Sequence, residues 1–355
     1  MLNQLAQLQK KSCLTKAHLV MLLWAASFNG IAADINLPML GDSSSGIVSK
    51  NQEFKLGKSW LQAFRRQVEQ HDDPLLQAYL EQLTFDLVIH SELEDTRLTL
   101  VLVNNPNINA FAVPGGIIGI NTGIFTYADN EDQLASIISH EIAHLSQRHF
   151  ARRLEARRSS ANINLAGLLA TLIVSSKSGT DAGIAALSAS QALAIDQQLR
   201  YSRNNEKEAD RQGLKIMKKS GRDPGAAAEM LEKMMALTRY SGSRLPEFLL
   251  THPITERRVA DTRSRTLEYK NHHYPDNSDF YIMKARTQVL HQDNPKYSIK
   301  FFRQKLKENS LNDDAYRYGL AIANSKAGNY DQAIEDLSGL LKKKPFYAPY
   351  IYTNI

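Results

Sequence analysis

Two histidines and a glutamate are spaced for metal-assisted chemistry in the segment His140-Glu141-Ile142-Ala143-His144. On a helix, residues four apart lie on one face, so the imidazoles of His140 and His144 can both reach one metal ion. Glu141 follows at about 100° round the helix, where its carboxylate can take a proton from water at that ion. Neutral imidazoles with a carboxylate and an open position favour zinc. The spacing therefore predicts a hydrolytic zinc site with Glu141 as its base.

The third zinc ligand must come from outside this segment. One known zinc motif places a histidine six residues after the second one, but Phe150 stands at that position. His149 would lie about 140° from His144 if the helix continued, which is a different face. We therefore predict that His149 is exposed and takes no part in the site.

A second helical stretch, residues 204–219, offers carboxylates. Its inward-facing stripe includes Glu206 and Asp210, whereas Glu208 is expected to point outward with its charged neighbours. We predict Glu206 as the third ligand. Asp210, one turn further on, is placed either to orient a ligand imidazole or to shuttle a proton.

A small sheet is predicted beside the zinc helix. The helix begins near Asp129 or Asn130, since either residue can cap it. Three strands are predicted at 97–103, 109–113 and 117–120. An extended substrate could add to the second strand by backbone pairing, although a plain core strand is the alternative. The candidate substrate-binding residues on that strand are Asn109, Ala110, Phe111 and Ala112.

Taken together, these motifs resemble those of the M48 metallopeptidases, whose pattern is HExxH followed by ExxxD. The chain carries the first motif at 140–144 and the second at 206–210. Residues 109–112 followed by Pro-Gly-Gly at 114–116 are also similar to that family. So is the stretch 251–258, which reads Thr-His-Pro and then, after two residues, Glu-Arg-Arg.

The resemblance implies a zincin-like domain with one Zn²⁺ per chain. Carried over residue by residue, it implies His140, His144 and Glu206 as the zinc ligands. It also implies Glu141 as the catalytic residue and Asp210 as a proton donor. These assignments agree with those predicted from spacing.

The stretch 251–258 contains His252 and Arg258, and more than one role is possible for each of them. His252 could donate to an oxyanion or occupy the fourth zinc position in a resting state, and a hydrogen-bonded loop histidine is the alternative. Our hypothesis is a self-inhibiting ligand. Arg258 is expected to support the site by pairing with a carboxylate.

The N-terminus has the features of a cleavable export signal. Residues 1–33 contain three lysines, no acidic residue and a short apolar run at 19–26, followed by small residues at 30–33. Because the run is shorter than the roughly 20 residues of a membrane span, a signal peptide is predicted, with a retained anchor as the alternative. Cys13, the one cysteine, lies in this segment. The rest of the chain is therefore expected in the periplasm.

The charge balance argues against a nucleic-acid partner. Lysine and arginine number 43 against 37 acidic residues, a net charge of +6 that includes the three lysines of the predicted signal peptide. A basic stripe after the zinc helix is interpreted as a solvated face. Attraction to acidic lipid head groups, and hence peripheral membrane contact, is the alternative. The stripe consists of Arg148, Arg152, Arg153, Arg157 and Arg158.

Beyond residue 275 the pattern changes to that of tetratricopeptide (TPR) helical hairpins. Residues 279–309 are interpreted as a degenerate repeat that precedes a better one. Since such repeats usually stack in threes or more, the array is either truncated or packed against the protease domain. The residues at repeat spacing are Leu320, Ala321, Gly328, Tyr330, Ala333 and Pro345.

The predicted fold is mostly α (α+β), with a small β-sheet in a zincin-like metallopeptidase domain. The predicted order is a signal peptide (1–33), the metallopeptidase domain (34–270) with an apolar lid-like insertion (161–195), and a TPR-like helical segment (276–355). Insertion of the segment 161–195 into the membrane is the alternative to a lid. The resemblance implies a periplasmic zinc endopeptidase for misfolded or stalled outer-membrane proteins, with the β-barrel assembly machinery as a candidate partner. A chaperone or scaffold that binds such proteins and rarely cuts them is the alternative.

Overall fold

The computed structural model describes residues 49–157, 203–240, 246–269, 272–308 and 312–353. The predicted signal peptide (1–33) and the predicted lid-like insertion (161–195) lie outside the described residues. Within the described ranges, no helix combines the length and the apolar character that a membrane crossing requires.

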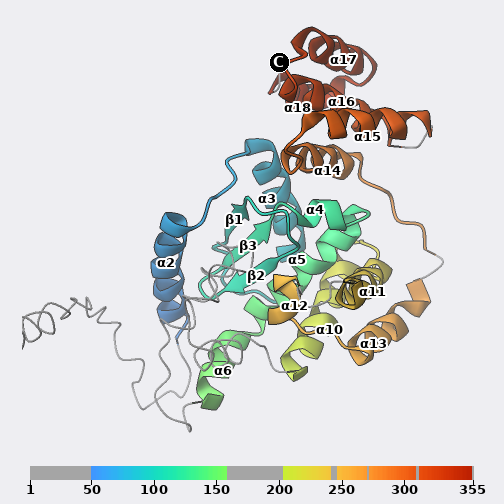
Figure 1. The fold of residues 1–355 in the computed structure, drawn as a ribbon. Helices are drawn as coiled ribbons and strands as arrows, with labels where there is room; N and C mark the ends of the chain where they lie inside the picture. Colours follow the sequence, from blue (N-terminus) through green and yellow to red (C-terminus); the bar gives the residue numbers. More distant parts are fainter. Residues whose placement is uncertain (1–48, 158–202, 241–245, 270–271, 309–311, 354–355) are drawn as a thin grey trace, which may run out of the picture. The chain divides into compact units, whose positions relative to one another are not determined.

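A three-stranded sheet lies at the centre of the metallopeptidase part (Figure 1). β1 (Thr99–Val103), β2 (Ala110–Val113) and β3 (Ile117–Asn121) are arranged in the order β1-β3-β2. β3 pairs parallel with β1 and antiparallel with β2, which leaves β2 at an edge. The turn between β2 and β3 needs glycine, because Gly115 and Gly116 have φ of +86° and +81°.

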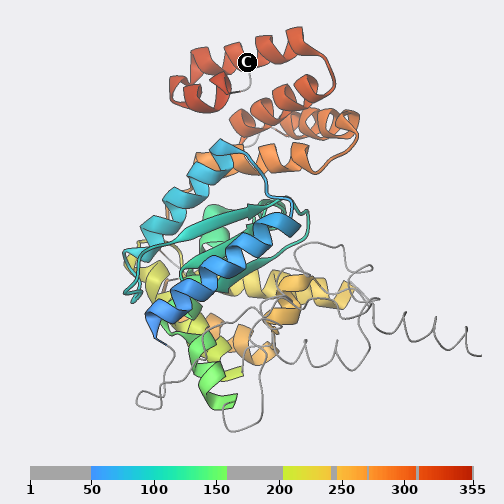
Figure 2. The same ribbon diagram turned by 90° about the vertical axis from the view of Figure 1, so that its left-hand side faces the viewer.

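Helices cover both faces of this sheet (Figures 1 and 2). α2 (Lys50–Gln67) crosses one face, where the ring centroid of Phe111 on β2 lies 5.8 Å from that of Trp60. α3 (Pro74–Val88) and α5 (Glu131–Ser146) pack on the other face. Because successive side chains of a strand point to opposite faces, the side chains of β2 pack alternately against the helices on the two faces of the sheet.

α5 carries the HExxH segment and begins within the predicted range. The side chain of Asn130 caps it by accepting the backbone N–H of Gln133 at 2.9 Å. The side-chain oxygen of Gln133 accepts the backbone N–H of Asp129 at 2.8 Å. A single turn, α4 (Ile124–Tyr127), precedes it. Nearly all of α5 is buried, so its histidines project into the interior and not into solvent.

The remaining helices of this part lie around α5. α10 comes so close to it that a Cβ on Gly213 would be 3.4 Å from the backbone nitrogen of His140. α10 ends before Gly221, whose φ is +72°. The elements are α6 (His149–Arg157), α10 (Arg203–Lys219), α11 (Gly225–Tyr240), α12 (Glu247–Thr251), α13 (Glu256–Thr266) and a 3-10 turn (Leu267–Tyr269).

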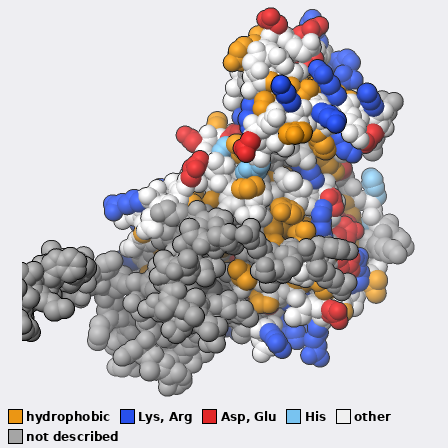
Figure 3. All heavy atoms as spheres, viewed as in Figure 1, with side chains coloured by type: hydrophobic (Ala, Val, Ile, Leu, Met, Phe, Trp, Pro, Cys, Tyr) orange, Lys and Arg blue, Asp and Glu red, His pale blue; other side chains and the backbone are white. Residues whose placement is uncertain are grey.

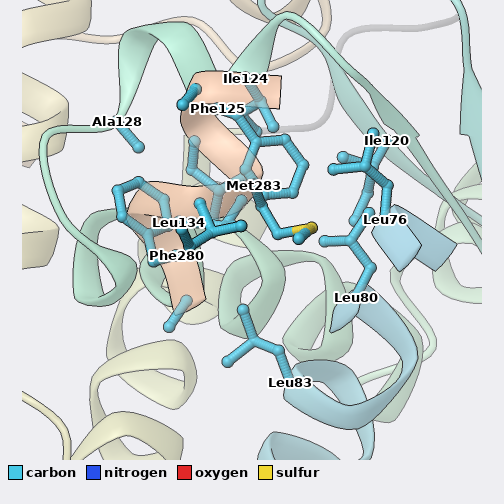
Figure 4. Close-up of a cluster of buried hydrophobic side chains, with 14 of the residues drawn as sticks. Leu76, Leu80, Leu83, Ile120, Ile124, Phe125, Ala128, Leu134, Phe280 and Met283 are labelled. Atoms are coloured by element: carbon cyan, nitrogen blue, oxygen red, sulfur yellow. The ribbon is translucent and has the colours of Figure 1, made fainter. Parts of the chain in front are cut away.

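The C-terminal helices follow one another as hairpins. Phe280 and Met283 of the first helix, α14, enter the core formed by α3, α4 and α5 (Figure 4). Arg286 of the same helix donates to Asp73, the N-cap of α3. The elements are α14 (Ser278–Leu290), α15 (Pro295–Lys307), α16 (Asp313–Lys326), α17 (Tyr330–Lys343), a 3-10 turn (Pro345–Tyr347) and α18 (Ala348–Tyr352).

The predicted fold class is confirmed. The described residues are predominantly helical with one small sheet, and the C-terminal helices are consistent with a TPR-like segment. The five residues before His252 form the short helix α12, which is not among the elements predicted from the sequence.

Candidate metal centre

Four buried side chains from three helices converge beside the sheet. His140 and His144 come from α5, Glu206 from the first turn of α10, and His252 from the position that ends α12. One ligand atom from each lies within 4.8 Å of the others. The Nε2 atoms of His140 and His144 are 3.0 Å apart. The structure therefore brings together the three residues predicted as ligands and places His252 beside them.

Glu206 faces both histidines of α5. Its carboxylate oxygens lie 3.5 Å from Nε2 of His140 and 3.6 Å from Nε2 of His144. Burial raises the pKa of Glu206, but its interactions with His252 and Arg258 outweigh burial and hold the pKa well below its usual value. The carboxylate is thus ionised, which is the form that binds a metal.

The pKa values of the two histidines of α5 shift in opposite directions. Burial lowers the pKa of His140, but hydrogen bonds to Asp210 and Glu206 raise it to about 9. Burial and the neighbouring charge of His140 hold the pKa of His144 well below its usual value. The upward shift of the pKa of His140 comes from the two carboxylates beside it, whose negative charge would also favour a metal cation.

Asp210 and Arg258 form a buried support behind His140. Oδ1 of Asp210 lies 3.1 Å from Nδ1 of His140. Nε and Nη2 of Arg258 donate to the two carboxylate oxygens of Asp210 at 2.8 and 2.7 Å, and Nη1 lies 2.8 Å from Oε2 of Glu206. Of the two roles open to Asp210, this geometry favours orienting His140, because both carboxylate oxygens are engaged behind the ring.

Glu141 is fully buried next to the four converging side chains. Among the described residues, no hydrogen bond of normal geometry reaches either of its carboxylate oxygens, although Nε2 of His252 lies 3.5 Å from Oε1. Burial raises the pKa of Glu141, and its interactions with His252 and His140 oppose that rise. A hydrogen bond of poorer geometry from the backbone of Ala112 also opposes it. A buried carboxyl with so little hydrogen bonding is costly for stability, and it can accept a proton from water.

The donor set fits a zinc ion. Catalytic zinc usually has three protein ligands, such as two imidazole nitrogens and a carboxylate oxygen, and a fourth coordination position that is open to water or substrate. The Nε2 atoms of His140 and His144 face Glu206, while their Nδ1 atoms face other side chains. Nδ1 of His252 lies 3.2 Å from Oε1 of Glu206, close enough for His252 to add a fourth donor.

His149 is not exposed, so that prediction is wrong. The residue is fully buried, and its Nδ1 lies 2.8 Å from Nδ1 of His144. α5 ends at Ser146 and Arg148 has φ +50°, so the helical angle used for the prediction does not apply beyond this turn. Glu208, predicted to point outward, faces His149 instead, with Oε2 3.3 Å from Nε2 of His149.

The four candidate residues of the substrate strand have different surroundings. Nδ2 of Asn109 donates to Oε2 of Glu247 at 3.1 Å, Ala110 lies in the hydrophobic core, and Phe111 faces α2. Ala112 lines a cavity of about 80 Å³ that is also lined by His144. Ala112 is thus the strand residue that borders open space beside the centre.

Glu247 was missed by sequence reasoning. It opens α12, the helix that ends at His252, and it is buried. Burial raises the pKa of Glu247 to about 7, although the hydrogen bond from Asn109 opposes the rise. No sequence pattern indicated this contact, because the two residues lie 138 positions apart.

The chain is similar in sequence to known proteins. The model of peptidase family M48 matches residues 74–266, which contain the whole centre. The beta-barrel assembly-enhancing protease of Escherichia coli (strain K12) is 36% identical over 316 residues, or 89% of this chain and 64% of that protein. The protein of the same name from Yersinia pestis is 34% identical over 310 residues, or 87% of this chain and 63% of that protein.

A more distant relative comes from mitochondria. The mitochondrial metalloendopeptidase OMA1 of Schizosaccharomyces pombe is 27% identical over 211 residues, or 56% of this chain and 57% of that protein. The chain spans less than two thirds of the length of each of these relatives.

Proposed function

The chain belongs to peptidase family M48, and from this membership we propose that it is a zinc-dependent endopeptidase. The observation that carries the proposal is the convergence of His140, His144 and Glu206, with the carboxylate of Glu141 buried beside them. Two imidazoles and two carboxylates in this arrangement suit metal-assisted hydrolysis of a peptide bond.

Each residue has a separate task in the proposed reaction. Zinc, when bound, supplies Lewis-acid chemistry to the peptide carbonyl and to water. Glu141 accepts the proton of the attacking water and then delivers it to the leaving amine. Asp210 holds the Nδ1 side of His140, which directs Nε2 to the centre. Arg258 keeps Asp210 and Glu206 ionised by contacting both carboxylates.

His252 is proposed as a regulatory fourth donor. Its burial and its distances of 3.2 Å to Glu206 and 3.5 Å to Glu141 support a resting state in which it occupies the position that water needs. The substitution His252→Ala should then raise proteolysis. Lost proteolysis would instead indicate that His252 serves the reaction itself, for example as a donor to the oxyanion.

The proposed substrates are unfolded or misassembled outer-membrane proteins in the periplasm. The names of the bacterial relatives, which refer to β-barrel assembly, support this class of substrate and make the assembly machinery a candidate partner. An extended substrate segment would pair with β2 and pass Ala112, which lines the cavity beside His144. Removal of residues 1–33 as a signal peptide and peripheral contact with the membrane remain parts of this proposal.

A client-binding scaffold is the second candidate function, and the C-terminal helices favour it. Tyr297 and Phe301, one turn apart on α15, are 63% and 40% exposed, so both rings are available to a client. Lysine and arginine side chains gather over the C-terminal helices (Figure 3). The exposed cations of α15 include Lys296, Lys300, Arg303 and Lys307.

One experiment separates the two functions. The purified zinc-loaded protein and its Glu141→Gln variant are incubated with an unfolded model protein, and cleavage and binding are both measured. Cleavage by the wild-type protein that is lost in the variant, with binding retained, would support the peptidase with Glu141 as its base. If the wild type, Glu141→Gln and His252→Ala all bind the model protein and none of them cleaves it, the scaffold function is favoured.

A further inference from the structure

We propose that His149 is a positioning residue for His144: it accepts the Nδ1 proton of His144, and Glu208 holds His149 in turn. The inference rests on the proposed function in one respect, namely that His144 binds the metal through Nε2. His149 lies outside the HExxH motif, and Glu208 stands at an unspecified position of the ExxxD motif.

The two ring nitrogens of His144 face different neighbours, Nε2 the metal centre and Nδ1 the ring of His149. Nε2 of His144 lies 3.0 Å from Nε2 of His140 and 3.6 Å from Glu206. A neutral imidazole that offers the lone pair of Nε2 to a metal carries its proton on Nδ1. Nδ1 of His149 lies 2.8 Å from that nitrogen, at normal hydrogen-bond distance. His149 is therefore the acceptor for this proton.

The rest of the hydrogen bonding agrees with this direction. If Nδ1 of His149 accepts, its own proton is on Nε2, which lies 3.3 Å from Oε2 of Glu208. The same oxygen of Glu208 accepts from Nη1 of Arg152 at 2.9 Å. All four nitrogens of the two rings are thus used in one arrangement of tautomers. A residue required only for packing at this fully buried position would not need two polar atoms.

The turn between α5 and α6 is built to bring His149 back to His144. Arg148 has φ +50°, and in the described ranges it is the one non-glycine residue with a positive φ. Its side chain donates to Glu53 on α2 from Nε at 3.1 Å, and Nη2 lies 3.0 Å from the same oxygen. This ion pair holds the unusual backbone conformation of Arg148 against α2. His149 is thus held by the turn before it and by the contact of its ring with Glu208.

The test is a zinc-affinity measurement on the full-length protein by competition with a chromophoric chelator. His149→Phe keeps a ring in the space but removes the acceptor, and we expect a loss of 10- to 100-fold in affinity. His149→Asn keeps an oxygen near the position of Nδ1, and the loss should be less than about tenfold. Arg211→Gln, an exposed position on the same helix as Glu208, should bind zinc like the wild type.

Two further readouts distinguish positioning from a merely structural role. The melting temperature of the metal-free His149→Phe protein should fall only slightly below that of the metal-free wild type, because the ring still fills the space and only the hydrogen bonds of His149 are lost. In ¹⁵N spectra of the zinc-loaded wild type, His144 should be protonated at Nδ1 and His149 at Nε2. Wild-type zinc affinity in His149→Phe, or the opposite tautomers, would overturn the role of His149. Absence of zinc binding by the wild type would overturn the proposed function, and this role with it.

Discussion

The two histidines of α5 are supported in different ways on the two sides of the centre. Behind His140 lie Asp210 and Arg258, whose side chains are 8% and 4% exposed and form a fully charged pair. Behind His144 lies neutral His149, backed by Glu208 and Arg152, whose side chains are 34% and 50% exposed. Charges interact strongly where water is excluded and weakly where it screens them. The charged pair behind His140 should therefore contribute more to the free energy of unfolding. The residues behind His144 should act mainly by orienting its ring.

Breaking the buried side should have the largest effect. Asp210→Ala leaves the buried charge of Arg258 with Glu206 as its remaining close carboxylate, and we expect a loss of up to about 3–5 kcal/mol in the unfolding free energy of the metal-free protein. Denaturant titration measures it. Asp261→Asn is the control, since its arginine partners are about half exposed and the cost should stay below about 1 kcal/mol. Equal losses in the two variants would remove the distinction between the buried and the exposed pairs.

Glu247 tests what happens to a buried carboxyl that has a neutral partner in place of an arginine. Its pKa is raised to about 7 in the folded protein, so its contribution is complete below the unfolded pKa of about 4.5 and is lost as the pH rises through 7. Glu247→Gln removes this titration. At pH 8 the metal-free variant should be more stable than the wild type by at most about 3 kcal/mol, since one pKa unit corresponds to about 1.4 kcal/mol.

At pH 4 the stabilities of Glu247→Gln and the wild type should converge. The check is the unfolding free energy of both proteins at the two pH values. A stability difference that is the same at pH 4 and pH 8 would show that Glu247 does not titrate in this range.

Zinc should stabilise both sides of the centre together. At a free zinc concentration of 100 times the dissociation constant, linkage gives about 2.7 kcal/mol, which chelation removes. Calorimetric melting with zinc and with a chelator measures the effect. Because Glu206 faces both histidines, Glu206→Gln should melt at nearly the same temperature in the two conditions. A melting temperature of the wild type that does not respond to zinc would contradict the proposed centre.

Breaking the exposed side should have the smallest effect on stability. Glu208→Ala removes the partner of Arg152 and His149, and we expect a loss of no more than about 1 kcal/mol in the metal-free protein. Its zinc affinity should still fall, though less than in His149→Phe. A stability loss as large as that of Asp210→Ala would show that the two sides are energetically alike.

Helical periodicity predicted much of the centre. The spacing of His140 and His144, and the inward stripe that contains Glu206, are local properties of single helices, and these residues do meet in the structure. The N-cap of α5 and the three strands were likewise readable from short segments. The roles of these residues in binding zinc and in catalysis remain proposals.

Periodicity failed where the chain changes direction. The angle between His144 and His149 assumes one continuous helix, but the turn at Arg148 ends α5 and reverses the direction in which His149 points. Glu208 was assigned to the outer face of α10, and α6 comes to lie against that face. No pattern within either helix specifies which neighbour will cover it.

By itself, the sequence determined the family, the fold class, the HExxH helix and the stripe that carries Glu206. Only the tertiary structure decided which side chains support each histidine. It also brought His252 to the centre and placed Glu247 against Asn109. The physical reason is one of range. Backbone hydrogen bonds set the direction of a side chain within a helix, whereas contacts between helices depend on how distant segments pack around a common core.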